Sequence, residues 1–116
     1  MGILNNSRNE KTLCTIPVPA FAVDSRLHVT YWNESMEELT GHPARNVIGK
    51  KPENFIHFKG ENPVDEALRM DRQVALKDYV LETSSSKEPF RANFSARPLR
   101  DSKNNTIGAI ATIVKS

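Results

Sequence analysis

The last third of the chain constrains the fold most, because extended, β-prone segments alternate there with polar turns. Residues 74–83 (VALKDYVLET), 90–99 (FRANFSARPL) and 106–114 (TIGAIATIV) are rich in the β-branched and aromatic residues that favour strands. The polar runs SSSKE and RDSKNN separate them. Short polar connections join antiparallel neighbours. We therefore expect a three-stranded antiparallel meander.

Two more strands are expected near the start of the chain. AFAVD (20–24) and LHVTYW (27–32) lie on either side of a DSR turn, where Asp and Ser side chains accept from nearby backbone amides. Asn33 follows the second strand, and its side chain suits the first turn of a helix as an N-cap. Gly41 suits the end of that helix.

Further short helices are expected in the middle of the chain. Pro43 and Gly49 would bound one helical piece, and ENFIHF (53–58) would form another. The clearest helix is ENPVDEALRMDRQ (61–73), with Asn62 as its cap. The order of elements predicts an α+β domain, in which a five-stranded antiparallel sheet carries short helices on one face.

Length, charge, the cysteine count and missing motifs limit the kinds of function that we expect of this chain. A chain of 116 residues is enough for one domain, and a formal net charge of +2 without a basic stripe argues against nucleic-acid binding. No apolar run is long enough to span a bilayer, so membrane insertion is not expected. Cys14 is the only cysteine, which suits a reducing, cytoplasmic compartment. Serine-hydrolase, zinc-protease and nucleotide-binding loop motifs are all absent, so we expect no enzyme.

Several short motifs resemble PAS domains in their order and spacing, over residues 16 to 115. They are Asp24, YWN (31–33), ELTG (38–41), VIGK (47–50), PF (89–90), PLRD (98–101) and IGAI (107–110). The resemblance implies a PAS domain over residues 16–116 with its PAS-like five-stranded sheet, preceded by a polar segment or short cap helix over residues 1–15.

PAS domains are sensory and dimerisation modules of histidine kinases, chemotaxis receptors and other regulators. The resemblance therefore implies a signal-sensing input domain of a cytoplasmic signal-transduction protein. Such a domain binds a small ligand or cofactor between sheet and helices and relays to a C-terminal output module of the same polypeptide. The alternatives are a ligand-free dimerisation and relay module, and a haem-binding redox or gas sensor.

Strand alternation provides an independent argument for a pocket. Phe90, Ala92, Phe94 and Ala96 share one face of their strand, as do Ile107, Ala109, Ala111 and Ile113 on the next, and Leu76 and Val80 on the third. Four alanines would then line the middle of the sheet, leaving either a modest apolar pocket or a core filled by helix side chains. The predicted pocket residues are Tyr31, Met36, Leu39, Ile48, Phe55, Ile56, Leu68, Phe94, Ala96, Ala109, Ala111 and Ile113.

His57 is the candidate haem ligand. It lies in FIHFKGENP, which resembles the histidine-bearing segment of haem PAS domains in oxygen-sensing chemoreceptors. Those sensors carry a gas-binding Trp on the last strand, where this chain has Ile113, so gas sensing in that manner is not expected. The Cys of flavin-binding LOV domains is also missing from the helical region, which excludes their covalent photocycle and leaves non-covalent flavin as a weaker alternative to haem.

Self-association is the expected quaternary state. If Val29 and Tyr31 face the core, Trp32 lies on the opposite face, where a bare indole is unfavourable. We therefore expect Trp32 and the leading segment around Leu13 to form a homodimer interface or a contact with an N-terminal cap helix.

Overall fold

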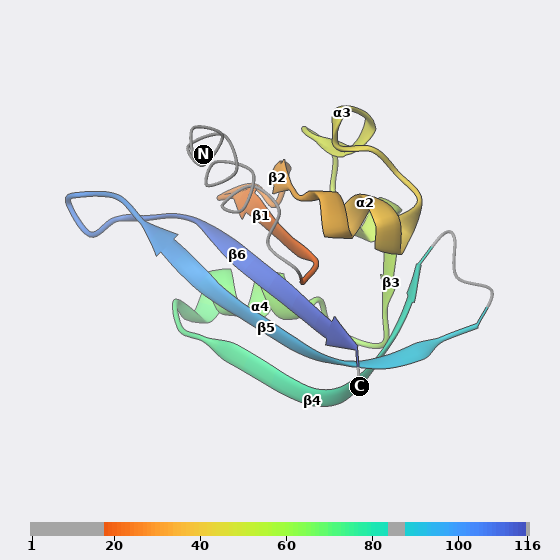
Figure 1. Ribbon diagram of the computed structural model, residues 1–116. Coiled ribbons are helices and arrows are strands. Elements are labelled where there is room, and N and C mark those ends of the chain that lie inside the picture. The colour runs from red at the N-terminus through yellow and green to blue at the C-terminus, as the bar shows by residue number, and fades with distance from the viewer. Residues whose placement is uncertain (1–17, 84–87, 116) are drawn as a thin grey trace, which may run out of the picture.

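The computed structural model describes residues 18–83 and 88–115 as one antiparallel sheet with short helices over one face (Figure 1). The elements in chain order are β1 (Ala20–Asp24), β2 (Val29–Trp32), α2 (Glu34–Thr40), α3 (Ala44–Val47), the 3-10 helix η1 (Pro52–Asn54), β3 (Ile56–Phe58), α4 (Pro63–Met70), β4 (Val74–Thr83), β5 (Phe90–Arg100) and β6 (Thr106–Lys115). The strand order is β2-β1-β6-β5-β4-β3. The hairpin, the meander and the α+β class are confirmed.

The sheet has six strands, so the prediction of five was wrong. The extra strand is β3, which comes from the piece expected to be helical. Ile56 pairs with Thr83 and Phe58 with Leu81, at the far end of β4. A three-residue strand shows no clear periodicity in the sequence, and its partner lies more than twenty residues away along the chain.

The sequence placed the N-caps of α2 and α4 and the end of α2 correctly. Asn33 accepts from the Met36 amide at the start of α2, and Gly41 ends that helix with φ 77°. Asn62 accepts from the Val64 amide at the start of α4. Pro43 is the N-cap of α3 and not its first helical residue.

Three β-bulges change which side chains face the helices: one in β2, one in β4 and one where β5 pairs with β6. In β2, Ala22 pairs with Tyr31 and Val23 with Val29, so Thr30 is an extra residue. In β4 the register shifts between Leu76 and Tyr79. A bulge reverses the alternation beyond it.

The consequences of these bulges contradict three face assignments made from the sequence. Trp32 faces the core and Tyr31 the outer side of the sheet, the reverse of the expectation, because Thr30 is extra. Val80 leaves the face of Leu76, and Leu81 is buried instead. Ile107, expected to share a face with Ala109, is 50% exposed beside the third bulge, where β5 and β6 shift register.

The core lies between the sheet and its helical cover. Phe21 is central to it, with ring centroids 5.7 Å from Trp32 and 6.4 Å from Phe94. Gly108 allows β6 to approach β1 closely, because a Cβ there would overlap the Val23 carbonyl. Among the described residues, no helix has the length and apolar character needed to cross a bilayer.

Candidate functional site

The space between sheet and helices is the predicted ligand site, and most of the predicted residues meet there. Met36, Ile56, Phe94, Ala96, Ala109, Ala111 and Ile113 are all 0–1% exposed, and Phe55 is 8% exposed. Leu39 and Leu68 are half-buried. Tyr31 lies on the outer face, and Ile48 is 45% exposed just after α3, so the structure does not bring these two into the interior.

The alanines that line this interior are closed off from solvent. Ala92 and Ala109 have no exposed surface, and a void large enough for one water would expose part of them. Met36 from α2 and Phe94 from β5 belong to the same buried cluster as these alanines. Among the described residues, the burial of Ala92 and Ala109 favours the core filled by helix side chains over a preformed pocket beneath the alanines.

His57 does not point toward this interior, contrary to the haem expectation. It lies in the middle of β3 and is exposed, whereas its neighbours Ile56 and Phe58 turn toward the core. Alternation along a strand forces this arrangement once the segment is extended and not helical. Among the described residues, no group of three or more His, Cys, Asp or Glu is placed to hold a metal ion.

Trp32 is a core residue and not an interface residue. It is 4% exposed, and its indole N–H donates to the His42 carbonyl at 3.1 Å. Its ring lies 6.0 Å from that of Phe55. Leu13, its expected interface partner, lies outside the described residues.

Asn33 does more than cap a helix, which local sequence reasoning missed. Its side-chain oxygen accepts from the Met36 amide at 2.9 Å and from the Ala20 amide at 3.1 Å, while its amide group donates to the Val18 carbonyl at 2.9 Å. The side chain is 3% exposed. One buried residue thus joins three parts of the molecule: Val18, which precedes β1, the first residue of β1, and the first turn of α2.

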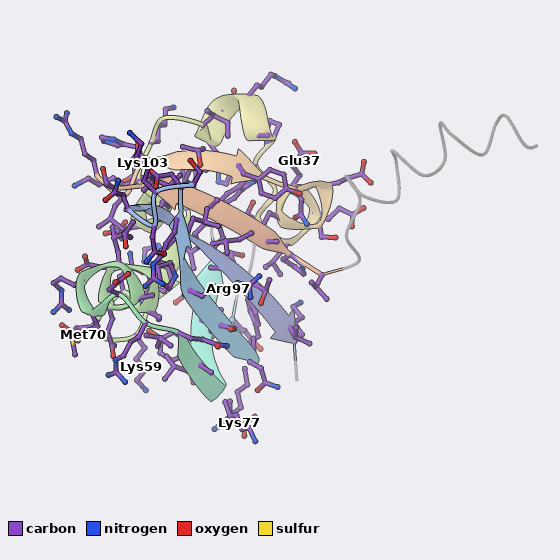
Figure 2. The ribbon with its side chains drawn as sticks, turned by 90° about the vertical axis from the view of Figure 1, so that its left-hand side faces the viewer. Glu37, Lys59, Met70, Lys77, Arg97 and Lys103 are labelled. Carbon is purple, nitrogen blue, oxygen red and sulfur yellow. The ribbon has the colours of Figure 1, made fainter. Side chains whose placement is uncertain are left out.

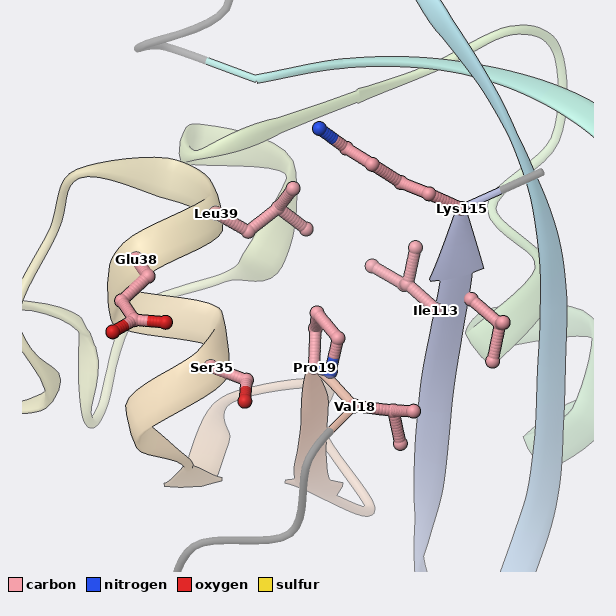
Figure 3. A pocket seen from close by; sticks show the side chains of 8 residues that line it. Val18, Pro19, Ser35, Glu38, Leu39, Ile113 and Lys115 are labelled. Carbon is pink, nitrogen blue, oxygen red and sulfur yellow. The ribbon is translucent and has the colours of Figure 1, made fainter.

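A groove of about 450 Å³ lies where the chain enters and leaves the domain (Figure 3). Its wall is built from three parts of the chain: Val18 and Pro19, then Ser35, Glu38 and Leu39 of α2, then Ile113, Val114 and Lys115 of β6. The Ile113 amide donates to the Pro19 carbonyl at 2.9 Å, so the incoming and outgoing chains are directly bonded. The sequence analysis did not identify this groove, because its three parts come together only in the fold.

Ionised groups lie at the edges of the domain and not in its interior. Asp71, after α4, accepts from Arg100 at 2.8 Å and from the Thr106 hydroxyl at 2.7 Å, and these two donors hold the pKa of its carboxyl below the usual range. The Tyr79 hydroxyl donates to the Lys59 carbonyl at 3.1 Å, and burial raises the pKa of this phenol. Lys59, Met70 and Lys77 extend outward (Figure 2).

Comparisons with known proteins agree with this architecture. The family model of the PAS fold matches residues 7–114. Phytochrome B of Oryza sativa subsp. indica is 32% identical over 101 residues, which cover 81% of this chain and 9% of the phytochrome. Phytochrome E of Ipomoea nil is also 32% identical over 101 residues, with the same coverage of each chain. The chain thus spans less than a tenth of the length of these relatives.

Solved structures show the same fold. The PAS domain of nitrogen regulation protein NR(II) from Vibrio parahaemolyticus has a TM-score of 0.75 at 14% identity, covering 93% of this chain and 97% of that one. The PAS domain of histidine kinase ThkA has a TM-score of 0.65 at 20% identity, covering 84% and 98%. A LOV domain of a blue-light activated histidine kinase from Erythrobacter litoralis has a TM-score of 0.69 at 18% identity, covering 86% and 96%.

Proposed function

The chain belongs to the PAS family, and from this premise we propose that it is a sensory relay domain of a larger signal-transduction protein. The observation that carries the proposal is the meeting of the incoming and outgoing chains. Pro19 is bonded to Ile113 at the end of β6, and Val18 is bonded to Asn33 at the start of α2. A displacement at either end of the domain therefore acts on the Pro19–Ile113 hydrogen bond, and the neighbouring Val18–Asn33 bond carries it to α2, as a relay requires.

The filled interior favours a relay that needs no resident ligand. The output module would follow β6, and the likeness to PAS domains of histidine kinases makes a kinase of that type its best candidate. We also propose that the domain acts as a homodimer. A cytoplasmic location fits the single cysteine, Cys14.

A small apolar ligand is the second candidate function, and the alanine floor of the sheet favours it. Met36 belongs to the same buried cluster as this floor, and an unbranched thioether side chain adapts easily to a new partner. If α2 moved outward with Met36, an alanine-lined space would open beneath it. Haem bound through His57 is not part of this proposal, because that side chain is exposed on the far side of its strand.

The relay is tested in a chimeric histidine kinase whose own PAS input domain is replaced by this chain. Asn33→Ser keeps a side-chain oxygen for capping α2 but loses the amide N–H that donates to the Val18 carbonyl, because one short hydroxyl group cannot reach both partners. We expect autophosphorylation to change by at least about fivefold, the lower range of coupling between sites. Asn62→Ser, the same substitution at the α4 cap, is the matched control and should leave the activity unchanged. Equal effects of the two substitutions would refute the relay.

The ligand candidate has a separate test. The purified chain is examined by absorption spectroscopy and by native mass spectrometry, which retains bound small molecules. A relay without a resident ligand predicts the mass of the polypeptide alone and no visible absorption. A bound mass that disappears when Ala109→Leu fills the alanine floor would instead establish the ligand site.

A further inference from the structure

Helix α4 buries little apolar surface of its own. Its buried residues are Pro63, Val64 and Ala67, all of them small. Val64 and Ala67 belong to the same buried cluster as Ala96 and Ala109 of the sheet. Because the gain from burial grows with the apolar area removed from water, such short side chains hold a helix less firmly than Leu or Phe would. The attachment of α4 to the sheet therefore depends strongly on polar contacts at its two ends.

The N-terminal end of α4 is held by an uncharged contact. The Tyr79 hydroxyl of β4 donates to the Lys59 carbonyl at 3.1 Å and lies 3.3 Å from the Glu61 carbonyl, just before the helix. The Tyr79 ring is fixed against Phe94, with 6.1 Å between the ring centroids. A hydrogen bond between a phenol and a backbone carbonyl joins two uncharged groups, so dissolved salt leaves it largely unchanged.

The C-terminal end of α4 is held by a charged contact. The Asp71 carboxylate, just after the helix, accepts from the Arg100 guanidinium at 2.8 Å and from the Thr106 hydroxyl at 2.7 Å. The Asp71 carbonyl accepts from the same guanidinium at 3.4 Å. Arg100 ends β5 and Thr106 begins β6, so one acidic residue joins α4 to both strands. The Asp71 and Arg100 side chains are 52% and 39% exposed, and salt therefore screens their attraction.

We propose that α4 is a strap that opens at its Asp71 end as ionic strength rises, while its Tyr79 end stays attached. The other ion pairs around this helix join residues of the same segment and not the sheet: Arg69 with Glu61 and Asp65, and Arg72 with Glu66. Salt therefore acts on the attachment of α4 mainly through Asp71. Opening exposes Ala67 to water. The inference depends neither on the proposed relay nor on a bound ligand.

Hydrogen exchange of the full chain, followed by mass spectrometry of its peptides, tests the strap. Asp71→Asn keeps a side-chain oxygen for the Thr106 hydroxyl but removes the charge that attracts Arg100. Asn also tolerates the left-handed conformation of residue 71, where φ is 54°. Glu61→Gln is the matched control, because it makes the same change in a carboxylate that pairs with Arg69 inside the segment. Thermal melts confirm that both variants fold.

At low salt we expect the α4 peptide to exchange about two- to fivefold faster in Asp71→Asn than in the parent chain, the range that exposed ion pairs provide. Sodium chloride at about 1 M should raise the exchange of α4 in the parent and in Glu61→Gln, but not in Asp71→Asn. Peptides from β5 and β6 should keep their rates throughout. An equal salt response of the parent and Asp71→Asn would overturn the proposal. Faster exchange of α4, β5 and β6 together would also overturn it, because the whole domain would then be opening.

Discussion

Asn33 is the residue on which the arrangement of the domain depends most. Its side chain satisfies the Ala20 amide, the Met36 amide and the Val18 carbonyl, and it is almost fully buried. Asn suits this position because its amide group combines an acceptor oxygen with donor hydrogens. Replacing it leaves several buried polar groups without partners at once.

We expect Asn33→Ala to lower the free energy of unfolding by about 2–4 kcal/mol, since it removes a helix cap and leaves buried backbone groups unpaired. Asn62→Ala is the matched control: it removes one cap hydrogen bond, to Val64, and should cost about 1 kcal/mol. Urea denaturation of both variants provides the measurement. Similar losses for the two variants would show that the contacts of Asn33 beyond the cap contribute little.

At the scale of elements, two hairpins use the same turn. Asp24 accepts from the amides of Arg26 and His28, and Asp101 accepts from those of Lys103 and Asn105. The third residue after each Asp has φ 67°. The first turn joins β1 to β2 and the second joins β5 to β6, so one short polar motif closes both hairpins.

These turns predict acid sensitivity. The His28 amide lowers the pKa of Asp24, and the Asn105 amide lowers that of Asp101, because both stabilise the charged carboxylate. A carboxyl with a lowered pKa in the folded state stabilises the fold above its unfolded pKa, near pH 4, and this contribution is lost as the pH falls through the folded value. We expect the melting temperature to fall below about pH 4. The fall should be smaller in the double variant Asp24→Asn, Asp101→Asn, and an equal fall would show that other groups dominate.

At the scale of the whole molecule, the outer face of the sheet replaces Trp32 as the candidate dimer surface. Tyr31, Ala22 and Ile110 lie side by side across β2, β1 and β6, and Arg97 follows on β5. Tyr31 and Ile110 are half-buried there, on the face of the sheet opposite the described helices. An apolar row in the middle of an open sheet face suits self-association.

We expect Ile110→Glu to weaken the dimer at least about tenfold, because it places a charge in the centre of the apolar row. Analytical ultracentrifugation over a concentration series measures the dissociation constant. Met70→Glu is the control, since Met70 is 50% exposed on α4 and points away from the sheet. A monomeric parent chain, or an Ile110→Glu variant that dimerises normally, would contradict this interface.

The sequence by itself determined the features that depend on near neighbours along the chain. The caps Asn33 and Asn62, the turn at Asp24 and the three long strands were all predictable, because their signals lie within a few residues. The alternation of β5 was predicted for the same reason, and Ala92, Phe94 and Ala96 are buried as expected. Motif order also sufficed to identify the PAS family, which the match over residues 7–114 confirms.

Only the tertiary structure decided which side several residues face and whether the interior is open. The extra residue Thr30 moved Trp32 into the core and Tyr31 out of it. No local sequence pattern reveals where a bulge inserts such a residue. Pairing with β4 turned the segment around His57 into a strand, which exposed that side chain. Whether alanines line a void depends on how far Met36 and Phe94 reach across the core, and the groove at Val18 exists only because the two ends of the domain meet there.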